Sequence, residues 1–194
     1  MAREGIGIKQ YGQVGAMLGA QDAPKWRCEY LVEKNWKASD LTHEAGDREV
    51  IQGVGNVLLN GGADIIWERL TTPAASTAVD VALSAFSTLS FIGVSLSTAT
   101  AAAAQTALQG TSTSRAYAAM EAGYPAHTTG TSTAARTCSF RSVFSTSAAN
   151  FAWQEWGIFN STNAAGRMLN RKQQSLGTKT SAAQWTFTAS LTLS

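Results

Sequence analysis

Charge is scarce in this chain of 194 residues, and its distribution gives no support for a nucleic-acid partner. Lys and Arg number 15, Asp and Glu number 13, and the formal net charge is +2. Proteins that bind nucleic acid gather Lys and Arg into clusters, and the sequence contains no such cluster. We therefore expect no nucleic-acid partner.

Long apolar runs are missing as well. No stretch reaches the roughly 18 apolar residues of a membrane-spanning helix. The first residues also lack the basic segment and apolar core of a signal peptide. The sequence thus predicts a protein that is made in the cytoplasm and has no membrane partner.

Cysteine and histidine are too few for the common metal sites. Cys28 and Cys138 are far apart and have no CxxC spacing, which favours two buried thiols over a disulfide or a metal pair. The only histidines are His43 and His127, so a site with several histidine ligands and an HExxH motif are both excluded. We expect no metal and no cofactor.

Catalytic motifs are absent too. The string Gly93–Ser97 lacks the second glycine of a GxSxG nucleophile turn. Asp64 and Glu68 are four residues apart, but a solvated acidic turn explains them better than a catalytic pair. Glu155, next to Trp153 and Trp156 in an aromatic stretch, is the one carboxylate in an apolar setting. An ion pair with Arg167 or Arg171 accounts for it at least as well as acid–base chemistry, so the sequence predicts that the protein is not an enzyme.

Small residues dominate instead. Ala, Thr and Ser number 33, 22 and 19, and they make up most of residues 71–150. Apolar residues are interleaved through that zone, which argues against a disordered linker. We expect a single domain over residues 21–194, with loops at residues 71–78 and 126–135. Residues 1–20 contain five glycines and few large apolar groups, which predicts an extended N-terminal arm able to pair with a neighbour's sheet edge.

Alternation of apolar and polar residues predicts a mainly β fold. The clearest case is Trp185–Leu193, where every second residue is apolar and the others are Thr or Ser. Shorter or more apolar strand patterns occupy residues 26–32, 89–96, 138–144 and 151–159. Five or more strands of this kind indicate a β-sandwich or a jelly-roll-like barrel.

Helical periodicity is weaker. A 3.6-residue spacing of apolar side chains predicts one helix near residues 48–70, after Asp47 as a possible N-cap. Gly53, Gly55 and the pair Gly61–Gly62 weaken this helix, and a break near Asn60 is expected. The Ala-rich residues 100–108 predict a second, short helix.

Seven strings occur in order along the chain: Leu58–Trp67, Ile92–Val94, Gln105–Gly110, Ala119–Pro125, Ala149–Asn160, Met168–Lys172 and Ser175–Thr180. Taken together, they resemble a family of tailed-bacteriophage virion proteins encoded in phage structural gene clusters. The resemblance covers about residues 50–194 and departs from the family's pattern after Val94, where this chain reads Ser95-Leu96-Ser97. It supplies no catalytic residue.

This resemblance implies a non-enzymatic structural protein located in the virion. Within the virion, the small size and the arm favour a decoration or cement protein that binds the outer capsid surface. Expected partners are the major capsid protein or other virion proteins, and a homo-oligomer is expected. The alternatives are a tail, neck or fibre-attachment protein, or a carbohydrate-binding receptor module with Trp153, Trp156 or Trp185 as stacking platforms.

The candidate contact residues come from the C-terminal third. After residue 121 the chain has six basic residues and one acidic residue, so an acidic partner surface would attract it. The candidate interface residues are Trp153, Trp156, Arg167, Arg171, Lys172 and Lys179.

Overall fold

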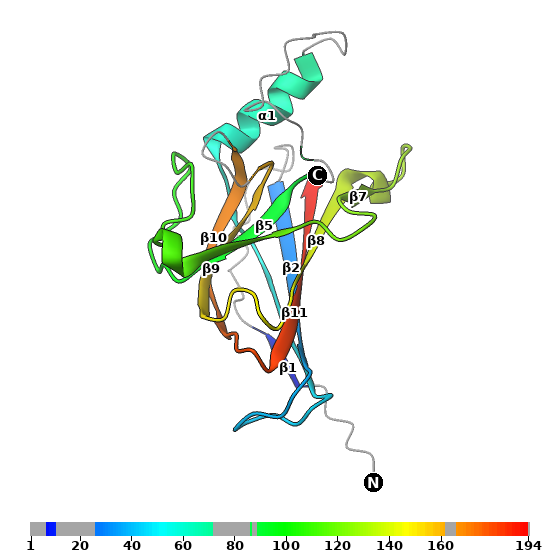
Figure 1. Cartoon of the computed structure of the whole chain (residues 1–194). Helices are drawn as coiled ribbons and strands as arrows, with labels where there is room; N and C mark the ends of the chain where they lie inside the picture. Colours follow the sequence, from blue (N-terminus) through cyan, green and yellow to red (C-terminus); the bar gives the residue numbers. More distant parts are fainter. Residues whose placement is uncertain (1–6, 11–25, 72–85, 87–88, 162–165, 194) are drawn as a thin grey trace.

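The computed structural model describes residues 7–10, 26–71, 86, 89–161 and 166–193, and there the chain forms two packed β-sheets and one α-helix (Figure 1). Half of the chain is strand and 9% is helix. The described strands form two separate sheets and no closed barrel. The mainly β prediction is therefore confirmed, and the architecture is compatible with the β-sandwich alternative.

The first sheet, sheet A, has six strands. Every neighbouring pair is antiparallel except β1 and β3, which run parallel. Strand β11, last in the described chain, lies in the middle and pairs with β2 on one side and β8 on the other. The order across sheet A is β1 (Gly7–Gln10), β3 (Arg48–Val54), β2 (Trp26–Trp36), β11 (Ala183–Leu193), β8 (Thr137–Phe144) and β7 (Ala126–His127).

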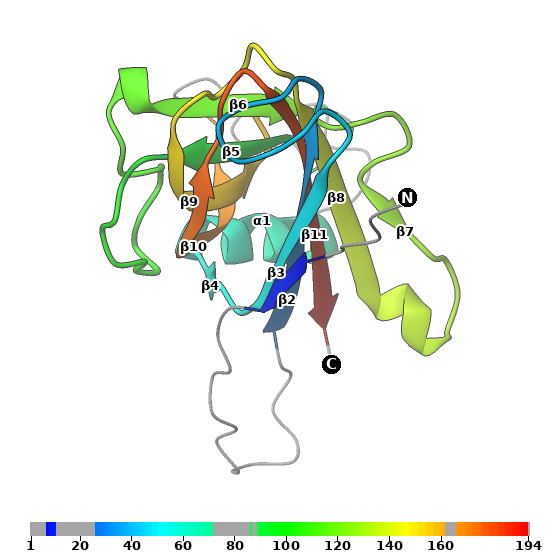
Figure 2. The same cartoon turned by 90° about the horizontal axis from the view of Figure 1, so that it is seen from below.

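The second sheet, sheet B, has five antiparallel strands. Helix α1 (Asn60–Thr71) covers one end of the sandwich, and Figure 2 shows the two sheets on either side of it. Two short 3-10 helices, η2 (Ser112–Ser114) and η3 (Thr133–Arg136), precede β6 and β8. The order across sheet B is β4 (Val57–Leu58), β10 (Met168–Thr178), β9 (Ala152–Phe159), β5 (Phe91–Ser95) and β6 (Arg115–Ala119).

The core between the sheets is largely aromatic. Alternation on β11 turns Trp185 and Phe187 inward, and the Trp156 ring from sheet B meets Phe187 with ring centroids 4.8 Å apart. Tyr30 of β2 packs against the same Trp156 ring at 5.4 Å. Burial of each such side chain contributes about 1.5–3 kcal/mol. The strands expected at residues 26–32, 89–96, 138–144, 151–159 and 185–193 are all confirmed.

The helix expected over residues 48–70 is correct only for its second half. Residues 48–54 and 57–58 form strands β3 and β4, and α1 begins at Asn60, where a break was expected. The glycines have packing roles that periodicity does not reveal. A Cβ at Gly53 would lie 2.3 Å from the Tyr30 hydroxyl, and one at Gly62 would lie 2.2 Å from the Leu169 carbonyl oxygen. Gly53 thus lets β3 pass Tyr30, and Gly62 lets α1 approach β10.

The second expected helix, over residues 100–108, is wrong. These residues form an irregular loop, because main-chain amide and carbonyl groups that would bond to each other in a helix have other partners. The Ala103 carbonyl accepts from the Asn60 amide at the start of α1, and the Ala102 amide donates to the Gln105 side chain. Tertiary contacts therefore override the helical propensity of alanine.

Only residues 7–10 of the expected N-terminal arm are described, and they form the edge strand β1. The loop expected at residues 71–78 lies outside the described residues beyond Thr71. The loop expected at residues 126–135 is confirmed in part, because it begins with the two-residue strand β7 and runs into η3.

Candidate functional site

An ion pair between Glu155 and Arg171 lies on the face of sheet B that points away from the core. Alternation explains its place: Trp156 and Ile158 of β9 point inward, so Glu155 and Gly157 face outward, and Arg171 of β10 is in register with Gly157. Arg171 Nε donates to Glu155 Oε2 at 2.5 Å, and Nη2 bonds the same oxygen. Neither side chain has any exposed area.

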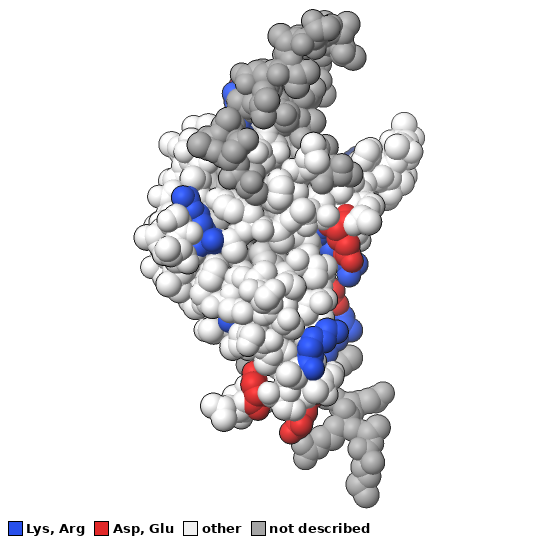
Figure 3. Space-filling view, viewed as in Figure 1, with Lys and Arg blue, Asp and Glu red and all other residues white. Residues whose placement is uncertain are grey.

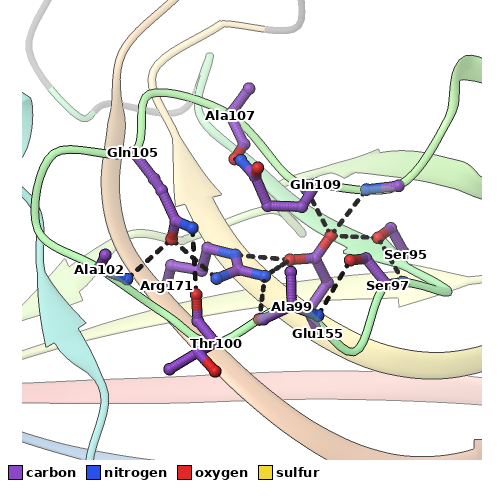
Figure 4. A network of polar contacts seen from close by, with 11 residues as sticks. Ser95, Ser97, Ala99, Thr100, Ala102, Gln105, Ala107, Gln109, Glu155 and Arg171 are labelled. Carbon is purple, nitrogen blue, oxygen red and sulfur yellow. Dashed lines mark hydrogen bonds and ion pairs between the residues drawn. The ribbon is translucent and has the colours of Figure 1, made fainter.

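The remaining bonds of this pair attach a loop to the sheet (Figure 4). Glu155 Oε1 accepts from the Ser95 hydroxyl and from the amides of Gln109 and Gly110, at 2.7 and 3.1 Å for the two amides. Arg171 Nη2 donates to the Ala99 carbonyl at 2.7 Å. Nη1 donates to the side chain of Gln105 at 2.8 Å. We call residues 96–114, which connect β5 to β6, the clamped loop.

An apolar contact supports the same loop. Leu108 is 2% exposed and belongs to a second, smaller cluster of buried residues with Leu59, Phe159 and Met168. This cluster lies outside the main core. Side chains of the clamped loop therefore cover the outer face of sheet B through both a polar and an apolar anchor.

The exposed side of the clamped loop carries no charge. Its nineteen residues contain no Lys, Arg, His, Asp or Glu and consist mainly of Ala, Thr and Ser. Leu96, at its start, is 46% exposed. The centres of interfaces between proteins are depleted in Lys, Asp and Glu but also in Ala and Ser, so it is the lack of charge in this loop, and not its small residues, that suits contact with another protein.

The geometry assigns Glu155 a positioning role. Both carboxylate oxygens accept hydrogen bonds from the chain, and the burial leaves no exposed atom for a substrate. Of the two partners considered for Glu155, the structure selects Arg171, while Arg167 pairs with Asp64. Ser95 donates its hydroxyl to Glu155, in agreement with its interpretation as an ordinary strand residue. The side chain of Glu68 lies outside the described part of the structure, so the geometry of the Asp64–Glu68 pair is not described.

A second buried cation fastens another loop. Lys179 is 1% exposed, and its ammonium donates to the Ser145 carbonyl at 2.6 Å and to Asn150 Oδ1 at 2.8 Å. Its backbone amide donates to the Phe151 carbonyl at 3.0 Å. Burial lowers the pKa of Lys179 to about 8. Lys179 therefore holds the connection between β8 and β9 against the start of the turn that leads to β11.

The structure corrects most of the expected interface. Trp153, Trp156, Arg171 and Lys179 are all buried, because aromatic packing holds the two rings and internal hydrogen bonds hold the two cations. Trp185 is also buried, so none of the three expected stacking platforms can receive a sugar ring in this structure.

The two other residues of that set are partly exposed and have internal partners. Arg167 forms its ion pair with Asp64, and Lys172 Nζ donates to the Val54 carbonyl at 3.3 Å. Arg141 similarly pairs with Glu121 at 2.8 Å. The basic excess of the C-terminal third is thus mostly engaged within the chain. Figure 3 shows a broad face without charge, with Lys, Arg, Asp and Glu mainly near its margins.

The expectation of two buried thiols is correct for Cys28, whereas Cys138 is only partly buried. Cys28 and Cys138 are free, and they oppose the same residue, Leu191, from the two sides of β11. Burial raises the pKa of Cys28 to about 12. The His43 ring stacks on Trp36 with centroids 3.5 Å apart, and His127 is exposed on β7.

The described residues hold neither a metal-binding cluster nor a membrane-spanning helix. They contain no group of three or more His, Cys, Asp or Glu that could hold a metal ion. Within the same residues, no helix has the length and apolar character needed to cross a membrane.

The fold and site together define a sheet sandwich that displays an ordered, uncharged loop. No protein-family model, no curated protein and no solved structure matches the chain.

Sequence reasoning considered the Glu155–Arg171 pair but missed the loop that it holds. Ser95 lies 60 residues from Glu155, and Gln105 lies 66 residues from Arg171. The sequence offered one sign that this loop is bonded to the domain, namely Gln105 and Gln109, the two longer polar side chains in an Ala-rich segment.

Proposed function

We propose that this chain is a non-enzymatic structural protein of a tailed-bacteriophage particle, and that it decorates the outer capsid surface by binding the major capsid protein. The observation that carries the proposal is the clamped loop. Its exposed surface is free of charge, so docking would remove no ionic group of the loop from water. Its conformation is fixed before binding, which lowers the entropic cost of association.

The resemblance to phage virion proteins supports the same function. Its strings contain Gln105, Gln109 and Gly110 of the clamped loop, Glu155 on β9 and Arg171 on β10. The resemblance thus includes the residues that fix the loop.

The test is the copy number of this chain in purified particles. Particles from the phage that encodes it are isolated gently, and the chain is quantified by mass spectrometry against the major capsid protein. We expect a simple ratio that corresponds to hundreds of copies per particle. A few to a few dozen copies would assign the chain to the neck, tail or fibre attachment, and its absence from particles would overturn the structural function.

A further inference from the structure

Strand β1 is attached to the rest of the domain at one sheet edge. It is the outermost strand of sheet A and pairs with β3 alone among the described strands, over the register Gly7–Glu49 to Gln10–Gln52 (Figure 2). The pairing is parallel. Backbone hydrogen bonds of this kind can be made equally well by the same segment of another chain.

The edge that receives β1 is built without it. Strand β3 pairs along its length with β2, from Arg48 opposite Asn35 to Val54 opposite Glu29. Ile51 is 3% exposed and part of the main core, so β3 is fixed from its inner side as well. The acceptor edge is therefore a preformed feature of the folded domain.

The covalent connection does not require β1 to pair with its own chain. Gln10 is opposite Gln52 on β3, and the start of β2 lies on the other side of β3. Gln52 is opposite Leu31, five residues along β2 from its first residue, Trp26. The ends to be joined are thus about 20 Å apart, because they are separated by two strand spacings across the sheet and by five residues along it. Residues 11–25 number fifteen, and such a length of chain can reach about 50 Å when extended. This length would also allow β1 to reach the β3 edge of an adjacent copy.

Exchange between copies preserves the interactions of this strand. The closed form and the exchanged form contain the same β1–β3 hydrogen bonds, so the balance depends mainly on the local concentration of neighbours. Copies held side by side raise that concentration to the millimolar range or above.

We propose that the β3 edge is an acceptor for strand β1 of a second copy of this chain, and that exchange of this strand links neighbouring copies. The partner is a segment of identical sequence, residues 7–10, and the contact is made by the main chain of residues 49–52. The use of this linkage in a particle rests on the proposed function, whereas the exchange itself is a property of the purified protein.

Cysteine cross-linking between differently labelled chains tests the proposal. Ile8 and Val50 are in register, at the strand spacing of about 4.8 Å, which lies within the range that a disulfide accepts. The single variants Ile8→Cys and Val50→Cys are refolded together at high protein concentration and oxidised. A covalent dimer that contains both variants is expected on a non-reducing gel and by mass spectrometry.

The matched control uses a register pair inside the domain. Asn35 on β2 and Gln184 on β11 are also opposite each other, but neither belongs to an edge segment. A mixture of Asn35→Cys and Gln184→Cys is expected to give no dimer above the level of the wild type, which contains only Cys28 and Cys138. Each single variant alone sets the background from random collisions.

The double variant Ile8→Cys/Val50→Cys decides the remaining outcomes. If it cross-links within one chain while the mixed single variants give no dimer, β1 stays with its own chain and the proposal is overturned. If neither experiment gives a cross-link, the β1–β3 pairing is absent and the proposal fails as well. Both results are independent of the copy number in particles, so they leave the proposed function to its own test.

Discussion

Glu155 on β9 and Arg171 on β10 are diagonal neighbours on adjacent strands with no exposed area on either side chain, and between them they bond residues near both ends of the clamped loop. Burial of two charges costs several kcal/mol in desolvation, and the attraction between them offsets this cost only when the other donors and acceptors are satisfied. Here Ser95, Gln105, two loop amides and one loop carbonyl supply those partners. The pair therefore specifies where the loop lies.

Removal of one partner of this pair is expected to destabilise the domain. Glu155→Gln or Arg171→Met leaves an uncompensated buried group, and each should lower the free energy of unfolding by about 3–5 kcal/mol. The double variant should cost less than the sum of the two. Urea unfolding of all four proteins measures the coupling.

The control for this comparison of single and double variants is the ion pair Asp64–Arg167, in which Asp64 is largely exposed. Asp64→Asn should change the free energy of unfolding by about 0–1 kcal/mol. Equal effects of Asp64→Asn and Glu155→Gln would contradict the role given to the buried pair.

A charge placed on the clamped loop should weaken docking without unfolding the domain. Ala104 is exposed within the loop, and Ala104→Glu would carry an ionic group into the interface. We expect at least a tenfold loss of incorporation into particles, measured by mass spectrometry, and an unchanged unfolding midpoint. Ala122→Glu, at an exposed position outside the loop, should be incorporated normally. Normal incorporation of Ala104→Glu would remove the loop from the interface.

Lys179 predicts a specific pH dependence of stability. Burial holds its pKa at about 8 in the folded protein, below its ordinary value of 10.5. Between these values the unfolded chain binds more protons than the folded chain, so the contribution of Lys179 to stability rises as the pH increases from 8 to 10.5. The stability of the wild type relative to Lys179→Met should increase over this range. Lys172→Met serves as the control, and a flat difference for Lys179→Met would refute the assignment.

The two thiols should differ in reactivity. Cys28 is fully buried and burial raises its pKa to about 12, so the folded protein presents almost no thiolate there. Cys138 is half-buried, and burial raises its pKa as well. With a chromogenic disulfide reagent at pH 8, we expect slow reaction of Cys138 and reaction of Cys28 only after addition of denaturant. A Cys138→Ser variant isolates Cys28, and rapid reaction of that variant in the folded state would contradict its burial.

The sequence predicted the strands better than the segments between them. Alternation identified β11 because the side chains on one face of this strand pack into a single core. The local pattern of apolar and polar residues was therefore enough to predict the strand. The same reasoning failed for residues 48–58, where Gly53 is explained by the Tyr30 ring. It also failed for residues 100–108, whose conformation depends on Arg171 and on the start of α1. Local patterns do not encode contacts with partners so distant in sequence.

The central position of β11 has a consequence for synthesis. Sheet A cannot be completed until residues 183–193 have left the ribosome, because β2 and β8 meet only through that strand. A nascent chain that has made β2, β3 and β8 still exposes the strand edges that await β11, and contacts of such high sequence separation form slowly. Premature termination before residue 183 would leave a product with no route to the native sheet, so only chains translated through β11 can form the complete sheet A.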